Sequence, residues 1–177
     1  PNRNRLFLLY SMIQWILNDV DYDAYLSTED NRISTTSTKA QIAYLVKFIN
    51  DLDGSIRYSY GYINDSNIDI TDRYTKLQFY DTSGAPDIYV GDLNLRPTGH
   101  YKYEVYEVSW LSSSANVTLG TAPTTELDVL PVANTNGVVK GLVTKGILNV
   151  TEKAGTEQVQ YTQHAEPDKT NYIYYGQ

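Results

Sequence analysis

The sequence predicts an all-β sandwich domain that is preceded by a short N-terminal helical arm. Apolar and polar residues alternate along several segments after residue 40, and this alternation is typical of half-buried strands. Turn-forming clusters rich in Gly, Pro, Asn and Asp separate these segments about every eight to twelve residues, a spacing that favours a sandwich. Tyrosine is unusually frequent, with 17 Tyr against 3 Phe and 2 Trp, and it fits pleated surfaces that are buried on one side.

The first segment, residues 1–31, is expected to form a helical arm followed by an acidic, polar linker. Apolar residues at steps of three and four place one stripe on a helix; they are Leu6, Leu9, Ile13, Ile16 and Leu17. A helix of this length is marginal alone and must dock on something. It could cover its own domain or contact a neighbouring subunit, whereas Lys and Arg are too few for a membrane-surface anchor. The residues expected to make the docking contact are Leu6, Leu9, Ile13, Trp15 and Leu17.

The sandwich domain is expected to span residues 32–177. Its predicted strands are Gln41–Asn50, Ser55–Ile63, Arg73–Tyr80, Asp87–Leu95, His100–Trp110, Glu126–Val132, Gly141–Glu152 and Glu157–Gln163. The segment Asp51–Gly54 is predicted to be a tight turn, because Gly54 is able to adopt positive φ. The long Ser/Thr-rich stretch Leu111–Thr125 is predicted to be a loop, and loops of this length are often functional or mobile.

A short motif around residue 97 narrows the fold class. Leu95, Pro97 and Tyr101 have the spacing of a tyrosine corner, in which a Tyr that opens a strand hydrogen-bonds back to the preceding turn. This motif favours an immunoglobulin-like Greek-key β-sandwich. Its role is structural, because such a hydroxyl satisfies a buried backbone group.

Composition and motifs give no support for catalysis or for a cofactor. The chain has no cysteine, so disulfides and thiolate metal sites are excluded. His100 and His164 are the only histidines, and neither belongs to a known metal or catalytic motif. With a net charge of −7, the chain is a poor candidate for nucleic-acid binding, and its longest apolar stretch is too short to span a membrane. We therefore expect no catalytic, cofactor or metal site.

Several stretches resemble small β-sandwich virion proteins of tailed phages of Bacteroidetes, including crAss-like phages and their marine relatives. They are Val46–Asp51, Thr71–Tyr74, Leu95–Glu107, Thr144–Val150 and Gly155–Tyr161. The resemblance covers roughly residues 32–175 and leaves out the predicted arm. It implies a non-enzymatic virion component, assembled in the host cytoplasm, whose partners are the major capsid protein or tail and neck subunits.

Within that class, the leading hypothesis is a capsid auxiliary or decoration protein that docks on neighbouring subunits through its N-terminal arm. A tail, neck or head-fibre attachment protein is the first alternative. A carbohydrate- or surface-binding module is the second, with Tyr58, Tyr60, Tyr62 and Trp110 as candidate contact residues, because binders use large rigid aromatic side chains. A small hydrolase, supported only by the abundant carboxylates, is the third.

Overall fold

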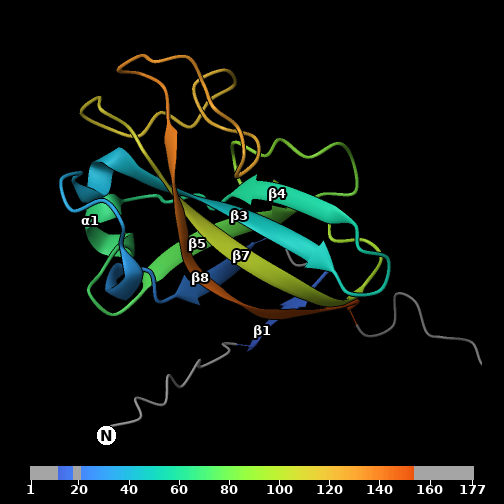
Figure 1. The fold of residues 1–177 in the computed structure, drawn as a ribbon. Coiled ribbons are helices and arrows are strands. Elements are labelled where there is room, and N and C mark those ends of the chain that lie inside the picture. Colours follow the sequence, from blue (N-terminus) through green and yellow to red (C-terminus); the bar gives the residue numbers. More distant parts are fainter. Residues whose placement is uncertain (1–11, 18–20, 154–177) are drawn as a thin grey trace, which may run out of the picture.

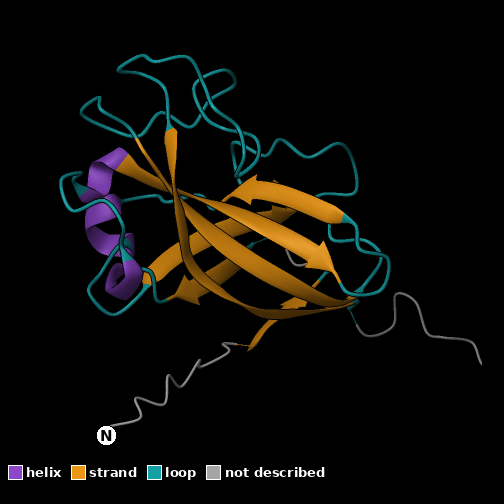
Figure 2. Ribbon diagram, in the orientation of Figure 1, coloured by secondary structure: helices purple, strands orange, loops and turns teal. Residues whose placement is uncertain are grey.

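The computed structural model describes residues 12–17 and 21–153 and shows an all-β fold (Figures 1 and 2). The strands are β1 (Met12–Ile16), β2 (Tyr22–Leu26), β3 (Ile42–Asn50), β4 (Ile56–Tyr60), β5 (Thr75–Asp81), β6 (Asp92–Leu93), β7 (Gly99–Ser109) and β8 (Val138–Thr151). Helical structure in the described residues is limited to the 3-10 turns η1 (Glu29–Asn31) and η2 (Lys39–Gln41) and the short helix α1 (Ser66–Asp69).

The strands form two sheets. The larger sheet has five strands in the order β1-β8-β7-β3-β4, and the smaller has three in the order β2-β5-β6. The neighbours are antiparallel except for β1 with β8 and β5 with β6, which are parallel. The chain crosses from the larger to the smaller sheet just after β4, because Tyr60 still pairs with Leu45 while Tyr62 forms a bridge to Gln78.

The main core lies between the two sheets and is built from alternate residues of each strand. The larger sheet contributes Tyr44, Val46, Phe48, Tyr101, Tyr103, Val105, Leu148 and Val150, and the smaller contributes Ala24, Leu26, Leu77, Phe79 and Leu93. Phe48 and Phe79 meet edge to face at 5.8 Å between ring centroids. The strands predicted over Gln41–Asn50, Arg73–Tyr80 and His100–Trp110 therefore contribute much of this core.

Residues Met12–Ile16 form strand β1, so the helix predicted over this segment is wrong. β1 pairs in parallel with β8, with Met12 opposite Ile147. Trp15 and Leu17 are only 2% and 1% exposed and belong to the main core, and the Trp15 ring stacks on Tyr22 at 4.7 Å. Five residues fit a period of two as well as one of 3.6, and pairing with the edge of β8 decides between them.

Three of the five side chains predicted to make the docking contact belong to the protein's own core or pack against it. Trp15 and Leu17 are enclosed by the chain's own core and Ile13 packs against it, so these side chains are not presented to a partner. Leu6 and Leu9 lie outside the described residues. Strand β2, within the predicted linker, pairs with β5, so the described part of residues 1–31 contributes strands to both sheets.

Two further strand predictions differ from the structure, and one lies beyond it. Glu126–Val132 contains no strand, and Asp87–Leu95 contributes only the two residues of β6. Apolar side chains in both segments suggested strands, but several of them, including Val90 and Val129, are exposed. Glu157–Gln163 lies outside the described residues.

The turn after Leu95 has the hydrogen bond that the tyrosine-corner spacing predicts. The Tyr101 hydroxyl donates to the carbonyl oxygen of Pro97 at 2.6 Å, and Leu95 is 1% exposed. Asn50 supports the same turn by donating from its side-chain amide to the Pro97 carbonyl at 3.3 Å. The turn between β6 and β7 is therefore fixed to the end of β3.

Candidate binding surface

The outer face of the five-stranded sheet is covered by the long connection between β7 and β8, residues 111–137, which we call the covering loop (Figure 1, yellow to orange). Beneath it lies a second cluster of buried residues, Ala43, Leu45, Tyr60, Val108, Trp110 and Ala122. β3 is consequently buried on both of its faces. The covering loop thus acts as an irregular second layer over this part of the sheet.

Backbone contacts and close packing hold the covering loop from beneath. The buried Tyr60 hydroxyl donates to the Pro123 carbonyl at 2.7 Å, and burial raises the pKa of this hydroxyl, which keeps it protonated as a donor. Gly137 lies against Trp110 so closely that a Cβ atom there would stand 2.6 Å from Cζ2 of the indole. The Ala115 amide donates to the Ala40 carbonyl at 2.6 Å.

A polar clamp formed by Lys47, Tyr58, Glu104 and Glu126 also anchors the covering loop. Lys47 of β3 lies opposite Tyr58 of β4 and Glu104 of β7, and Glu126 of the covering loop sits over them. Its carboxylate accepts hydrogen bonds of 2.6 Å from both Lys47 Nζ and the Tyr58 hydroxyl. Lys47 also forms a 3.7 Å ion pair with Glu104, which accepts a hydrogen bond from Tyr106.

The contacts of the clamp shift the pKa values of its charged groups. Burial would raise the pKa of the Glu126 carboxyl, but the hydrogen bonds from Lys47 and Tyr58 outweigh it, and the pKa lies below its ordinary value. The hydrogen bond to Glu126 likewise raises the pKa of Lys47. Because the lysine and glutamate side chains are only 14% and 13% exposed, solvent screens their attraction less than that of a surface pair.

The covering loop exposes large hydrophobic side chains among its exposed Ser, Thr and Asn residues. Five of its large hydrophobic side chains are between 77% and 105% exposed; they are Leu111, Leu119, Leu127, Val129 and Val132. The loop has no Lys, Arg or His. Its only carboxylates are those of Glu126, in the clamp, and Asp128, which accepts hydrogen bonds from Thr124 and Thr125. A partner that covered these hydrophobic side chains would therefore desolvate apolar groups without stripping water from an unpaired charge.

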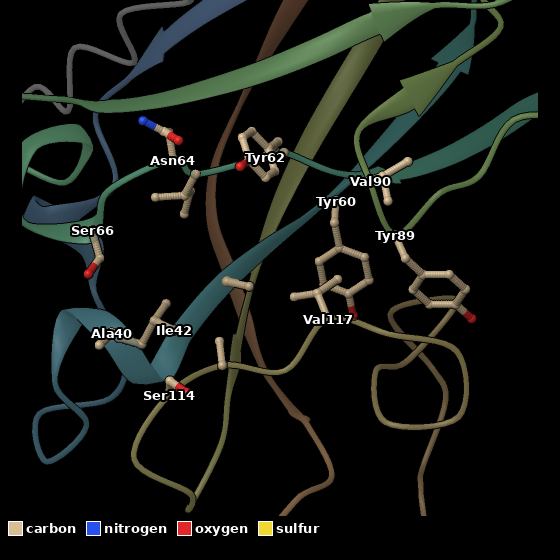
Figure 3. A pocket seen from close by; sticks show the side chains of 14 residues that line it. Ala40, Ile42, Tyr60, Tyr62, Asn64, Ser66, Tyr89, Val90, Ser114 and Val117 are labelled. Carbon is tan, nitrogen blue, oxygen red and sulfur yellow. The ribbon is translucent and has the colours of Figure 1, made fainter.

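A groove of about 440 Å³ lies beside the covering loop, where the chain crosses from one sheet to the other (Figure 3). Its lining comes from η2 and β3, the crossing segment 60–64, α1, residues 89–90 and the covering loop. Tyr60 forms part of the floor and its ring stacks beside that of Tyr89, 6.2 Å away. Gly61 is required here, because a Cβ atom would stand 2.6 Å from Cβ of Leu77.

The four aromatic residues predicted as a sugar-binding set do not form one surface. Tyr60 and Tyr62 both line the groove, and Tyr62 is 43% exposed. Trp110 is 1% exposed beneath the covering loop, and Tyr58 belongs to the clamp. Sequence reasoning found the alternation of these residues but missed Tyr89 and the clamp, which depend on contacts between distant segments.

Other candidate sites are sparse within the described residues. His100 is exposed at the start of β7, and His164 lies outside the described part. No group of three or more His, Cys, Asp or Glu side chains in residues 12–17 and 21–153 is placed to hold a metal ion. None of the helices in that part of the chain is long and apolar enough to cross a membrane.

Comparison with known proteins provides no relative. No family model, no curated protein and no solved structure matches the chain.

Proposed function

We propose that the chain is a non-enzymatic structural protein of a tailed-phage virion, and that it docks on another virion subunit through the covering loop. A capsid auxiliary or decoration protein is the favoured role, and a tail, neck or head-fibre attachment protein is the alternative. The sequence resemblance to phage proteins supports the class. The exposed hydrophobic side chains of the covering loop carry the docking proposal.

The covering loop is anchored to the sheet on one side and exposes hydrophobic side chains to solvent. Contiguous exposed apolar patches mark protein-protein contacts, and the cores of such contacts are depleted of charge; we propose that the five exposed hydrophobic side chains of the covering loop contribute to such a patch. A loop held by Tyr60, Trp110 and the clamp is also ordered before binding, which reduces the entropy lost on docking. The proposed docking surface replaces the arm contact predicted from the sequence, since Trp15 and Leu17 are core residues.

We further propose that the sandwich belongs to the immunoglobulin-like Greek-key class. The hydrogen bond from Tyr101 to Pro97 supports this assignment, since this contact ties a strand to the preceding turn in such domains.

Particle composition tests the proposed function. Phage particles are assembled in the presence of the native protein and purified. Quantitative mass spectrometry should then detect the chain in them. The double variant Leu127→Asp, Val129→Asp should reduce its amount about tenfold or more, because two carboxylates would have to be desolvated in the contact. The matched control, Ser83→Asp with Ala85→Asp, adds the same charge to an exposed turn between β5 and β6 and should be incorporated normally.

Each unfavourable result has a distinct meaning. If the native chain is absent from purified particles, the virion role is wrong. If the chain is present and the double variant is incorporated as well as the native protein, the covering loop is not the docking surface. The variants are compared only after circular dichroism shows that both have folded.

A further inference from the structure

Several polar side chains line the groove beside the covering loop without taking part in the hydrogen bonds of the fold. Within the described residues, no hydrogen bond is formed by the side-chain amide of Asn64 or by the side-chain hydroxyls of Ser66, Ser114, Tyr62 and Tyr89. Elsewhere in the same region polar side chains are engaged, as Tyr60 is with Pro123. The groove therefore combines an apolar, aromatic floor with a rim of uncommitted donors and acceptors.

We propose that this groove binds a neutral pyranose sugar unit, such as one in a surface polysaccharide. A pyranose ring has an apolar C–H face, which packs on aromatic rings, and an equatorial edge of hydroxyls, which pair with amides and hydroxyls. The groove supplies both elements, because Tyr62, Asn64, Ser66 and Ser114 all line it (Figure 3) and the Tyr62 side chain is exposed.

The charge of the groove selects a neutral ligand. None of its lining residues is Asp, Glu, Lys, Arg or His, so a charged sugar would lose hydration without gaining a partner. Its volume of about 440 Å³ falls within the range of small-molecule sites, about 300–1,000 Å³. Its position at the crossing between the sheets fixes its shape, because Gly61 packs directly on Leu77.

The site goes beyond the proposed virion role and is independent of it. The residues proposed for docking, Leu127 and Val129, do not line the groove. A particle protein with both surfaces would attach to the virion by one and to a neutral glycan by the other. Failure of either proposal leaves the other standing, because the two experiments change different residues and measure different quantities.

Saturation-transfer NMR and calorimetric titration of the full chain test the proposal. The probes are cellotetraose, xylotetraose, mannotriose and N-acetylchitotriose. We expect at least one to bind, and we expect Tyr62→Ala and Asn64→Ala each to weaken that binding by about tenfold or more through lost stacking or hydrogen bonding. Asn64→Ala removes a side chain that bonds to no described residue, so it tests the site without threatening the fold.

The control is Tyr25→Ala, which removes a tyrosine that is 55% exposed but lies in β2, outside the groove. It should leave sugar binding unchanged. The proposal is overturned if no probe binds at millimolar concentration, or if Tyr62→Ala and Asn64→Ala bind as tightly as the native chain. Saturable binding of a proline-rich decapeptide in place of the sugars would also overturn it, and would assign the groove to an extended peptide.

Discussion

The two faces of the five-stranded sheet are buried in different ways. The inner face meets a second sheet, and both partners are regular strands with alternating apolar residues. The outer face meets the covering loop, which has no strand and is fixed by a few specific contacts. The inner face provides the stability common to any sandwich, while the outer face supports a surface that is ordered yet free to present apolar side chains to solvent.

This difference separates the part of the molecule that maintains the fold from the part that is available for function. In a packed core every side chain is committed to its neighbours. In the covering loop only the anchoring side is committed, through Tyr60, Trp110 and Glu126. The opposite side keeps Leu127 and Val129 in solvent at 82% and 94% exposure. Changes on the two faces should therefore have different consequences.

The largest expected effect is on the inner face. Trp15→Ala should lower the free energy of unfolding by about 3–5 kcal/mol, because it removes a buried aromatic side chain and leaves a cavity. Chemical denaturation monitored by far-UV circular dichroism would measure this change. Met12→Ala, in the same strand but at a side chain that is 63% exposed, should change it by no more than about 0.5 kcal/mol. Equal effects of the two substitutions would contradict the placement of β1 in the core.

A smaller effect is expected beneath the covering loop. Gly137→Ala would force a Cβ atom against Trp110 and should lower the free energy of unfolding by about 1–3 kcal/mol through overpacking. Thermal unfolding would report the loss, and near-UV circular dichroism would report the displaced indole. Ser113→Ala, at an exposed position of the same loop, is the control. An unchanged indole signal in Gly137→Ala would indicate that the loop does not pack on Trp110.

The smallest effect is expected in the clamp, and it should depend on pH. The pKa of Glu126 is lowered in the folded state, so the clamp stabilises the fold above the ordinary carboxyl pKa, about 4.3 for glutamate. That stabilisation should be lost as the pH falls through the lowered value.

Glu126→Gln isolates this contribution. Asp53 and Asp128 also have lowered pKa values, so acidification weakens the native protein for more than one reason. The difference in free energy of unfolding between native protein and Glu126→Gln should shrink as the pH is lowered from 7 towards 3. A difference that stayed constant over this range would show that the glutamate charge contributes nothing to the clamp.

The sequence was sufficient to predict the strands that form the inner face. β5 and β7 alternate over seven residues or more, and that length distinguishes a period of two from one of 3.6. β3 was predicted from its richness in strand-forming residues. β1 was mistaken for a helix because its five residues fit both periods, and its pairing with β8 involves residues more than 130 positions away. A local sequence pattern carries no information about a contact between residues so far apart in the chain.

The outer face was harder to predict for the same physical reason. Glu126–Val132 resembles a strand in composition, yet Leu127 and Val129 are exposed and Glu126 is held by Tyr58, 68 residues earlier in the chain. The groove itself was not predicted, although two of its lining residues, Tyr60 and Tyr62, were candidate contact residues from the sequence. Its polar lining was not predicted either, since Ser114 joins Asn64 and Ser66 in the groove only after the covering loop folds over the sheet.

Residue-resolved hydrogen exchange of the native protein tests most directly whether the covering loop is an ordered layer. The amides of Ala115, Thr121 and Gly137 donate to the carbonyls of Ala40, Thr118 and Thr121. We expect these amides to exchange much more slowly than an unstructured peptide, and to lose protection in Gly137→Ala. Exchange of all three at the rate of an unstructured chain would contradict the account, because a loop that is disordered in solution presents no fixed docking surface.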